Sequence, residues 1–554
     1  MDTPKALQLI NLGEKLSFLN GIGAKRLSDD KLSAVSVLRV CEGAKIHIIS
    51  QLPVRRLVVT ADSLGAKSLA RKLQSWGVKT SYLPYRDDVL LPRKTFSAQS
   101  VRERVNTLCD VAFDDTQIIV TSADSLLQFF PTRSLVKRFS VCVKKEDIIS
   151  PQTLADKLTV AGYKRQAMIA DVGDFAVRGD IVDVFGIDGV AHRINFFDEL
   201  VEDIKVLDVE SMLASNEVQT VRFAPVSDIL LDEKGYESAI EQLSLHQDNK
   251  FAVEVKEGLS VGACEPSCVW ALPFMKDCTT PLLQFFDDDK PTLVVFDEPK
   301  VVFDKLQILA KEFDGRIKNL LEGGEILSTH KDVSVPLNEI KRELVFLRKM
   351  SFSSLSLNNQ LFDPKYIIEP KTKPVTKYYL DPQTIVQDIK TFSLNGTKVI
   401  MACSSKERAK TVIDSLREYD VFATYSEDGN DDGGVLATPL CVETGVIYPA
   451  SKVCLIGVGE CIGKHRGEDI SVRGKEQALA PKAGDYVVHR IHGVGLCEGT
   501  AILKTGDFEK EYIVLKYKDG DTLYVATDQM NNLQKFVGEE HPAVSYTHLT
   551  LPTN

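Results

Sequence analysis

Residues 174–208 read DFAVRGDIVDVFGIDGVAHRINFFDELVEDIKVLD, and this stretch decides the fold of the region around it. Three β-rich runs, Asp180–Phe185, Ala191–Phe197 and Glu202–Leu207, are separated by short turns rich in Gly, Asp and Glu. Apolar side chains that recur at period two between such turns predict an antiparallel meander. A sheet of this kind can pack one face on a core and present the other face to a partner.

The bulk composition limits the class of protein. The chain has 554 residues, too many for one hydrophobic core, so several domains are expected. Its formal net charge of -11 argues against a general nucleic-acid binder. No apolar run approaches the length of a membrane span and the first residues lack a signal-peptide core, so we expect a cytoplasmic protein without membrane contact. The 11 cysteines are scattered and predict neither disulfides nor a metal site.

Residues 1–134 show the alternation of an α/β domain. Arg56–Thr60, Val78–Leu83 and Gln117–Ser122 are predicted strands, and the triplet Ala61-Asp62-Ser63 is expected to cap the helix that follows the first of them. Strand, helix and strand in this rhythm indicate a parallel sheet. The α/β character returns over residues 211–335, so the β-rich module at residues 135–210 is expected to be inserted within one larger domain.

The meander closely resembles the UvrA-binding region shared by UvrB and the bacterial transcription-repair coupling factor family (Mfd). The motifs that carry this resemblance are FAVRGDIVDVF at 175–185, RINFFD at 193–198 and VLD at 206–208. The resemblance implies that the flanking α/β segments form a RecA-like domain of the UvrB type, and that the inserted module binds UvrA.

The family's UvrA contacts fall on a few positions of this chain. The resemblance places them at Arg178 and, after the Gly-Tyr pair, at Lys164, with Arg165 an equally good candidate. Phe185 is included, although a core position suits it better than a contact. Arg178 either pairs with the aspartates of its own strands or presents an exposed guanidinium to a partner's carboxylates. We favour the second interpretation.

A RecA-like domain that binds nucleotide needs a phosphate loop. The expected place, residues 19–26, carries Gly21, Gly23 and Lys25 but lacks the Gly-Lys-Ser/Thr ending that holds Mg²⁺ and phosphate. A degenerate loop is typical of the coupling factors, whereas UvrB keeps an intact one. Asp297 and Glu298, after the run LVVF, are interpreted as a strand end. We therefore predict no catalytic, cofactor-binding or metal-binding residue in this chain.

The next segments carry little chemistry. Residues 336–374 are predicted to be a linker with some helix, because they are Ser- and Asn-rich near their middle. Residues 375–465 indicate a second α/β domain of unassigned role, with a strand at Thr397–Ala402 and a helix that begins near Lys406. Residues 466–481 are predicted to be a flexible linker.

Residues 482–540 predict a small all-β barrel, because short alternating strands are separated by Gly and Asp turns. The motifs GDYVVHRIHGVG, KEYIVLKY and DTLYVA resemble the CarD-like, Tudor-like module that binds RNA polymerase. In that module an exposed strand pairs with a sheet of the polymerase β subunit. The resemblance places the contacts at Leu503, which could equally be a core residue, and at Tyr512, Ile513, Val514 and Leu515.

These predictions combine into one interpretation. The chain is identified as the N-terminal half of a coupling factor, which binds stalled RNA polymerase and recruits UvrA. We expect it to stop before the family's motor, which uses ATP and Mg²⁺ on double-stranded DNA, and to end in an irregular tail at residues 541–554. We therefore predict no ATPase activity. The alternatives are a UvrB-like excision nuclease subunit and a CarD-type transcription regulator.

Overall fold

The computed structural model divides the chain into two units, Met1–Gly463 and Lys464–Asn554. The structure describes residues 34–52, 54–86, 97–246, 250–286, 290, 292–323, 326–354, 362, 364, 366–378, 381–427, 433–458, 484, 486–489, 493–505, 508–517, 522–526 and 533–535. The predicted loop at residues 19–26, the linker at 466–481 and the tail lie outside the described residues. No helix in the described part combines the length and apolarity needed to cross a membrane.

The first unit is built on a seven-stranded parallel sheet with the order β19-β1-β18-β17-β2-β4-β3. Its strands are β1 (Ala34–Leu38), β2 (Arg55–Thr60), β3 (Thr80–Leu83), β4 (Ile118–Ser122), β17 (Thr292–Asp297), β18 (Arg348–Ser353) and β19 (Tyr366–Ile368). The parallel pairing is continuous from β19 to β3. The parallel α/β sheet expected from the sequence is therefore confirmed.

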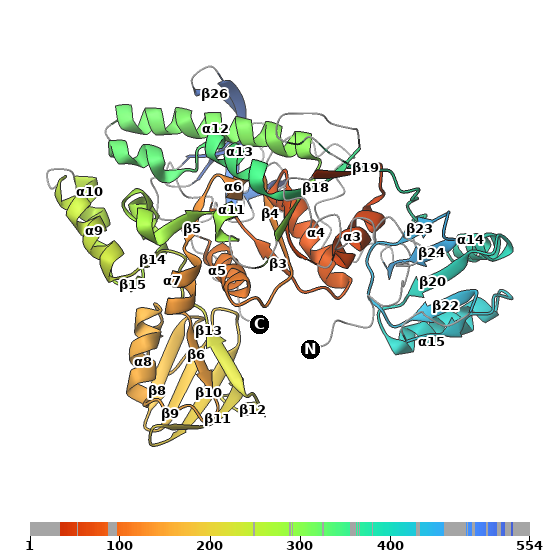
Figure 1. Cartoon of the computed structure of the whole chain (residues 1–554), viewed down its shortest axis with the longest axis horizontal. Helices are drawn as coiled ribbons and strands as arrows, with labels where there is room; N and C mark the ends of the chain where they lie inside the picture. Colours follow the sequence, from red (N-terminus) through yellow and green to blue (C-terminus); the bar gives the residue numbers. More distant parts are fainter. Residues whose placement is uncertain are drawn as a thin grey trace. The chain divides into compact units, whose positions relative to one another are not determined.

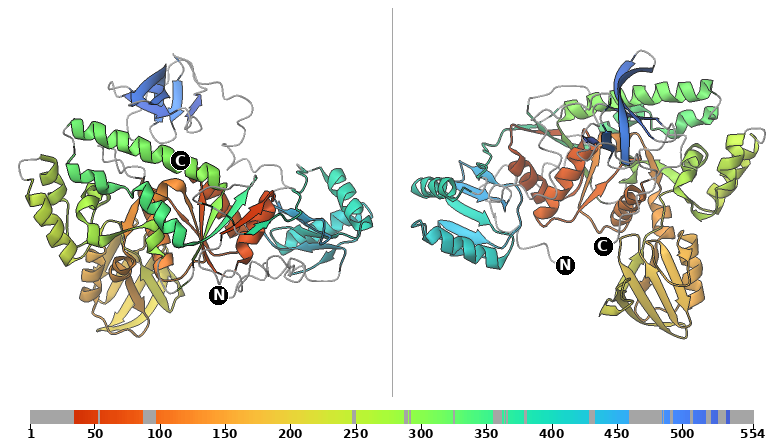
Figure 2. Two further views of the ribbon diagram at one scale, coloured as in Figure 1. Left: turned by 45° about the horizontal axis from the view of Figure 1, so that its top comes forward. Right: turned by 180° about the vertical axis from the view of Figure 1, so that it is seen from behind.

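Helices cover both faces of this sheet (Figure 2). Helices α3 (Glu42–Gln51) and α4 (Ser63–Ser75) pack on one face, whereas α5 (Ala98–Ala112) and the long α12 (Pro299–Glu322) pack on the other. Burial on both sides explains the apolar runs 57–59 in β2, 118–120 in β4 and 293–296 in β17, all of which are buried. Within the predicted capping triplet, Asp62 caps α4, because its side chain accepts a hydrogen bond from the Gly65 N–H at 2.7 Å.

The segment that we expected to be a linker belongs to this sheet. It contributes helix α13 (Leu337–Phe346), strand β18 in the middle of the sheet and strand β19 at its edge. The Ser-rich composition was misleading, because the Ser351 hydroxyl is buried and donates to the Ser36 hydroxyl of β1 at 3.1 Å. Paired hydroxyls inside a sheet do not carry the cost of unsatisfied polar groups.

The inserted module is a six-stranded sheet with the order β12-β11-β10-β9-β8-β7 (Figure 1). Its strands are β7 (Lys164–Arg165), β8 (Asp174–Arg178), β9 (Ile181–Phe185), β10 (Ala191–Phe197), β11 (Leu200–Leu207) and β12 (Ala214–Glu217). Strands β8 to β12 pair antiparallel, which confirms the predicted meander. Helix α8 (Pro151–Val160) packs on one face, and β6 (Val141–Lys144) pairs with β13 (Thr220–Phe223) where the chain enters and leaves.

A buried ion cluster joins the module to the α/β domain. Asp228, just after the module, accepts hydrogen bonds from Arg86, which follows β3, and from Arg104 of α5. All three side chains are almost fully buried. Because each charge has a partner of opposite sign, the cluster can hold the module against the domain without an unpaired buried charge.

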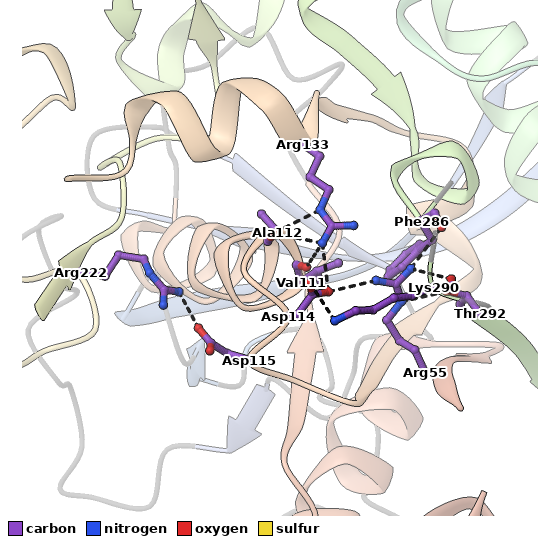
Figure 3. Close-up of polar contacts among 10 residues, drawn as sticks. All are labelled: Arg55, Val111, Ala112, Asp114, Asp115, Arg133, Arg222, Phe286, Lys290 and Thr292. Atoms are coloured by element: carbon purple, nitrogen blue, oxygen red, sulfur yellow. Dashed lines mark hydrogen bonds and ion pairs between the residues drawn. The ribbon is translucent and has the colours of Figure 1, made fainter. Parts of the chain in front are cut away.

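A second set of ion pairs lies at the end of α5 (Figure 3). Asp114 has a left-handed backbone (φ 62°) and binds Arg133 at 3.0 Å and Arg55 at 3.5 Å. Arg133 also donates to the last carbonyls of α5, which closes that helix. Arg222 of β13 binds Asp115 at 2.5 Å, so the module is tied to the domain at this point too.

The remaining described elements of the α/β domain are short. They are α6 (Ala123–Leu126), β5 (Phe129–Pro131), α7 (Arg133–Phe139), β14 (Leu230–Leu231), α9 (Glu233–Ser244), α10 (Lys250–Glu257), β15 (Gly262–Ala263), β16 (Thr279–Pro281) and α11 (Leu282–Phe285), with 3-10 turns at Pro266–Phe274, Lys276–Cys278 and Ser328–Val333. Many of them contribute to the large core that the α/β domain shares with the inner face of the module.

A second, five-stranded sheet follows with the order β21-β22-β20-β24-β23. Its elements are α14 (Pro382–Leu394), β20 (Lys398–Ala402), α15 (Lys406–Arg417), β21 (Thr424–Tyr425), β22 (Val435–Thr438), β23 (Val446–Tyr448) and β24 (Val453–Ile456). Helices α14 and α15 cover one face and helix α3 of the first sheet packs on the other. The backbones meet closely there, because a Cβ on Gly43 would lie 2.0 Å from the carbonyl oxygen of Gly445.

The second unit contains a five-stranded antiparallel sheet with the order β28-β27-β26-β25-β29. Its strands are β25 (Tyr486–His489), β26 (Gly493–Thr505), β27 (Phe508–Lys516), β28 (Thr522–Ala526) and β29 (Leu533–Lys535). Val487, Cys497, Ile513 and Leu515 form its small buried core.

Candidate partner-binding face of the inserted sheet

The strand register assigns each side chain of the inserted sheet to one of two faces. Phe175, Val184 and Ile194 are buried on the inner face, in the core shared with the α/β domain. Their neighbours along the strands point the other way, because successive side chains of a strand alternate. This outer face carries Arg178 and Asp183, and it is the only face of the described sheet that is not packed on α8 and the domain core.

Two arginines converge on one buried carboxylate on the outer face. The Asp183 side chain is 1% exposed, and Arg193 donates to its two oxygens at 2.7 and 2.9 Å. The Arg178 guanidinium donates to the same carboxylate and keeps 46% of its side chain exposed. The hydrogen bonds from Arg193 to Asp183 raise the pKa of Arg193 further above its usual range. Two cations on one anion give this cluster of three side chains a net positive charge.

Both sequence-based interpretations of Arg178 therefore describe part of the geometry. Arg178 pairs with an aspartate of the neighbouring strand, and it also presents a half-exposed guanidinium to solvent. The sequence reasoning missed Arg193 as a functional candidate. Arg193 stands directly opposite Asp183 in the register of the meander, and directly opposite residues share a face. Pairing the two strands in the sequence could therefore have identified Arg193.

The register also separates the two alternative basic residues. Lys164 pairs with Asp174, which lies on the outer face, whereas Arg165 pairs with the inner-face residue Phe175. Both are exposed at the edge of the sheet. Lys164 lies 3.5 Å from Glu265, a weak contact because both side chains are well exposed.

Phe185 lies on the outer face as well, where it has apolar neighbours. It packs against a small cluster of buried residues, Ile169, Ala176, Ala191 and Leu207. Its ring is partly buried and belongs to the packing of the outer face. The structure thus brings Arg178, Lys164 and Phe185 to one face and leaves Arg165 aligned with the other.

A second candidate site is the carboxyl end of the parallel sheet, where α/β proteins bind nucleotides. A phosphate loop joins a strand to the helix that follows it. Among the described residues the turn at 39–41, between β1 and α3, is one such position. Residues 19–26, where we predicted this loop, lie outside the described residues.

The chain's own side chains fill this position. The Lys45 ammonium of α3 lies 2.6 Å from the Asp297 carboxylate at the end of β17, so the lysine and the acid at this position are paired with each other. The Cys41 N–H, at the helix N-terminus, donates to the Thr372 hydroxyl at 3.1 Å. Arg39 binds Glu369 at 3.0 Å. Within the described residues, no group of three or more His, Cys, Asp or Glu side chains could hold a metal ion.

The predicted polymerase contacts lie in the hairpin of β26 and β27. Ile513 and Leu515 are buried in the core of the second unit, and Val514 between them is partly exposed. Leu503 lies in β26 and Tyr512 in β27. Residues 512–516 pair with β26 on one side and β28 on the other, so their backbone offers no open edge.

Comparisons with known proteins match the two regions of the chain that carry these candidate residues. The UvrB interaction domain model matches residues 141–228, and the CarD-like/TRCF RID domain model matches residues 482–537. A transcription-repair-coupling factor of Staphylococcus haemolyticus is 24% identical over 82% of this chain and 40% of the relative. One of Bacillus subtilis is 23% identical over 79% of this chain and 39% of the relative. The chain thus spans about 40% of the length of these curated relatives, and the resemblance inferred from its motifs is confirmed.

Proposed function

From this similarity to transcription-repair-coupling factors, we propose that the chain acts in transcription-coupled DNA repair in the cytoplasm. It binds RNA polymerase through its C-terminal β unit and recruits UvrA through the outer face of the inserted sheet. One observation carries the proposal: a UvrB interaction domain and a polymerase-interacting domain match the same chain. Each alternative function accounts for only one of the two domains.

The UvrA-binding surface is proposed to centre on Arg178 and Lys164. Both lie on the outer face, and the Arg178 guanidinium is anchored by Asp183 while half of it remains exposed. An arginine held in place loses less rotamer entropy when it forms a bidentate pair with a partner's carboxylate. Arg193 shares the Asp183 carboxylate and supports this arrangement from the next strand.

The C-terminal unit is proposed to close into a small CarD-like barrel that binds the polymerase β subunit by adding a strand to its sheet. Residues 512–515 are flanked on both sides, so the docking edge belongs to another part of the unit. Residues 508–511 of β27 pair with β26 but extend beyond the pairing with β28. They sit next to Leu503 in the hairpin register, which favours this end of the hairpin as the docking edge.

We propose further that the β1–α3 turn binds no ATP. The pairing of Lys45 with Asp297 supports this, because nucleotide would have to break that ion pair and displace Thr372 from the Cys41 N–H. The carboxyl end of the sheet then serves to hold α3 and the segment after β19 in place.

Binding to purified UvrA and to purified RNA polymerase tests the proposal. The chain is expected to bind both proteins. Arg178→Ala is expected to weaken UvrA binding by at least about tenfold and to leave polymerase binding unchanged. Arg342→Ala, which removes an exposed arginine of α13, is the matched control. Binding to UvrA alone would favour the UvrB-like alternative, and binding to polymerase alone would favour the CarD-type regulator.

A further inference from the structure

Three large apolar side chains form a row across one end of the inserted sheet. Leu200 stands directly opposite Phe197 in the β10–β11 pair and directly opposite Ile148 in an isolated antiparallel bridge. Directly opposite residues place their side chains next to each other on one face. The row is exposed, at 80% for Ile148, 74% for Phe197 and 40% for Leu200.

The row lies on the outer face. Phe196 and Val201, the chain neighbours of Phe197 and Leu200, are buried in the core on the inner face. Phe197 and Leu200 therefore project to the side that carries Arg178 and Arg193. Single exposed apolar residues are ordinary on protein surfaces, whereas adjacent ones in register form a patch that marks an interaction site.

Carboxylates surround the row. Asp147 precedes Ile148, and Asp198 and Glu199 form the turn between Phe197 and Leu200. Asp180 is the next neighbour, since its carbonyl accepts the Phe196 N–H at 2.8 Å. All four side chains are exposed. The nearby Lys145 is engaged by Glu217 at 2.7 Å, on the edge strand β12.

We propose that Ile148, Leu200 and Phe197 form an apolar anchor for a protein partner whose own apolar side chains are flanked by Lys or Arg. The acidic rim selects that chemistry by charge complementarity, and the apolar row supplies the buried contact area. The inference rests on the proposed function, because the row shares its face with Arg178. It deepens that function, since the recruited protein contacts two ends of one surface.

The two ends carry opposite requirements. Arg178 would pair with a carboxylate of the partner, whereas the four carboxylates around the apolar row would pair with cations of the partner. A partner that satisfies both can dock in only one orientation, because the reversed orientation would place like charges together. Phe197 is an exposed aromatic side chain with apolar neighbours in register, and aromatic residues are enriched in protein interfaces.

The test measures UvrA affinity by biolayer interferometry with the whole chain. The double variant Ile148→Ser, Phe197→Ser is expected to weaken binding by about tenfold or more. The double variant Asp198→Asn, Glu199→Lys, which keeps a residue suited to the left-handed backbone at 198 (φ 59°), is expected to slow association at low salt. Leu245→Ser, which changes an exposed apolar residue at the end of α9, is the matched control and is expected to bind as the wild type does. Because these side chains are already exposed, none of the changes should lower the thermal midpoint.

Each outcome decides between the two proposals. If the wild type binds UvrA, and Arg178→Ala weakens it while the row variant does not, the anchor is refuted and the proposed function stands. If the wild type does not bind UvrA, both are refuted. Sedimentation of the wild type covers a third case: a dimer that the row variant converts to a monomer would make the row an interface between copies, which also overturns the inference.

Discussion

Asp228 offers the sharpest test of how the binding module is held. Its carboxylate accepts hydrogen bonds from Arg86 at 2.5 and 2.9 Å and from Arg104 at 2.6 and 3.3 Å. Burial alone would raise the pKa of Asp228, but Arg104 and Arg86 hold it well below its usual range. Asp228→Asn keeps the shape and removes the charge, so two buried guanidinium groups lose their counterion. Removing one partner from a buried ion cluster costs about 3–5 kcal/mol.

Urea denaturation followed by tryptophan fluorescence measures this cost. The chain has 2 tryptophans, Trp76 and Trp270, and both lie in the α/β domain, so the signal reports that domain. With an m-value of about 2 kcal/mol/M, the midpoint should fall by about 1.5–2.5 M urea. The control Asp332→Asn breaks an exposed pair with Lys276 and should shift the midpoint by less than about 0.5 M. A shift for Asp228→Asn no larger than the control would refute the reasoning.

The same cluster predicts a pH dependence. The folded pKa of Asp228 is depressed, so its stabilising contribution is present above the unfolded pKa of about 4 and is lost as the pH falls below that value. The wild type should therefore lose stability below about pH 4, and Asp228→Asn should show a smaller loss over the same window. Midpoints measured in a pH series on both proteins check this sign.

Three further predictions concern helix α3. Gly43→Ala should destabilise the contact with the second α/β sheet by about 1–3 kcal/mol, which would be measured as faster proteolysis of residues 375–458. The control is Gly315→Ala on α12, where a Cβ would meet open space, and this change should be neutral or stabilising. Burial lowers the pKa of His47 to about 4. As the pH is lowered from about 6.5 to 4, the free energy of unfolding should therefore fall by up to about 1.4 kcal/mol per pH unit. Urea titrations of His47→Gln should show a smaller dependence of the unfolding free energy on pH. Lys45→Ala should lower the free energy of unfolding by about 1 kcal/mol in the same titrations. Calorimetric titration with ATP should give no heat of binding for either the wild type or the variant.

The local elements of the fold were predictable, and the long-range pairings were not. The meander, the parallel strands β2, β3, β4 and β17 and the cap before α4 follow from periodicity and turn residues, which act over a few neighbouring positions. Strand β18 was missed because the hydroxyl partner of its Ser351 is Ser36, 315 residues away in sequence. The pairing of Arg193 with Asp183 and the place of the β1–α3 turn also depend on register and strand order, which no short motif encodes.

In this chain, one surface of the α/β domain stabilises the fold and a different surface, that of the inserted sheet, is exposed for binding. At the carboxyl end of the parallel sheet, Lys45 and Asp297 satisfy each other, so this end stabilises the domain. The inserted sheet differs from this end of the domain. Its inner face packs in the shared core, whereas Arg178 and Phe197 remain exposed on its outer face. A sheet fixed by its core and by Asp228 presents these residues in a set geometry, which lowers the entropy lost on binding. Loosening the Asp228 cluster should therefore weaken partner binding even though no contact residue has changed.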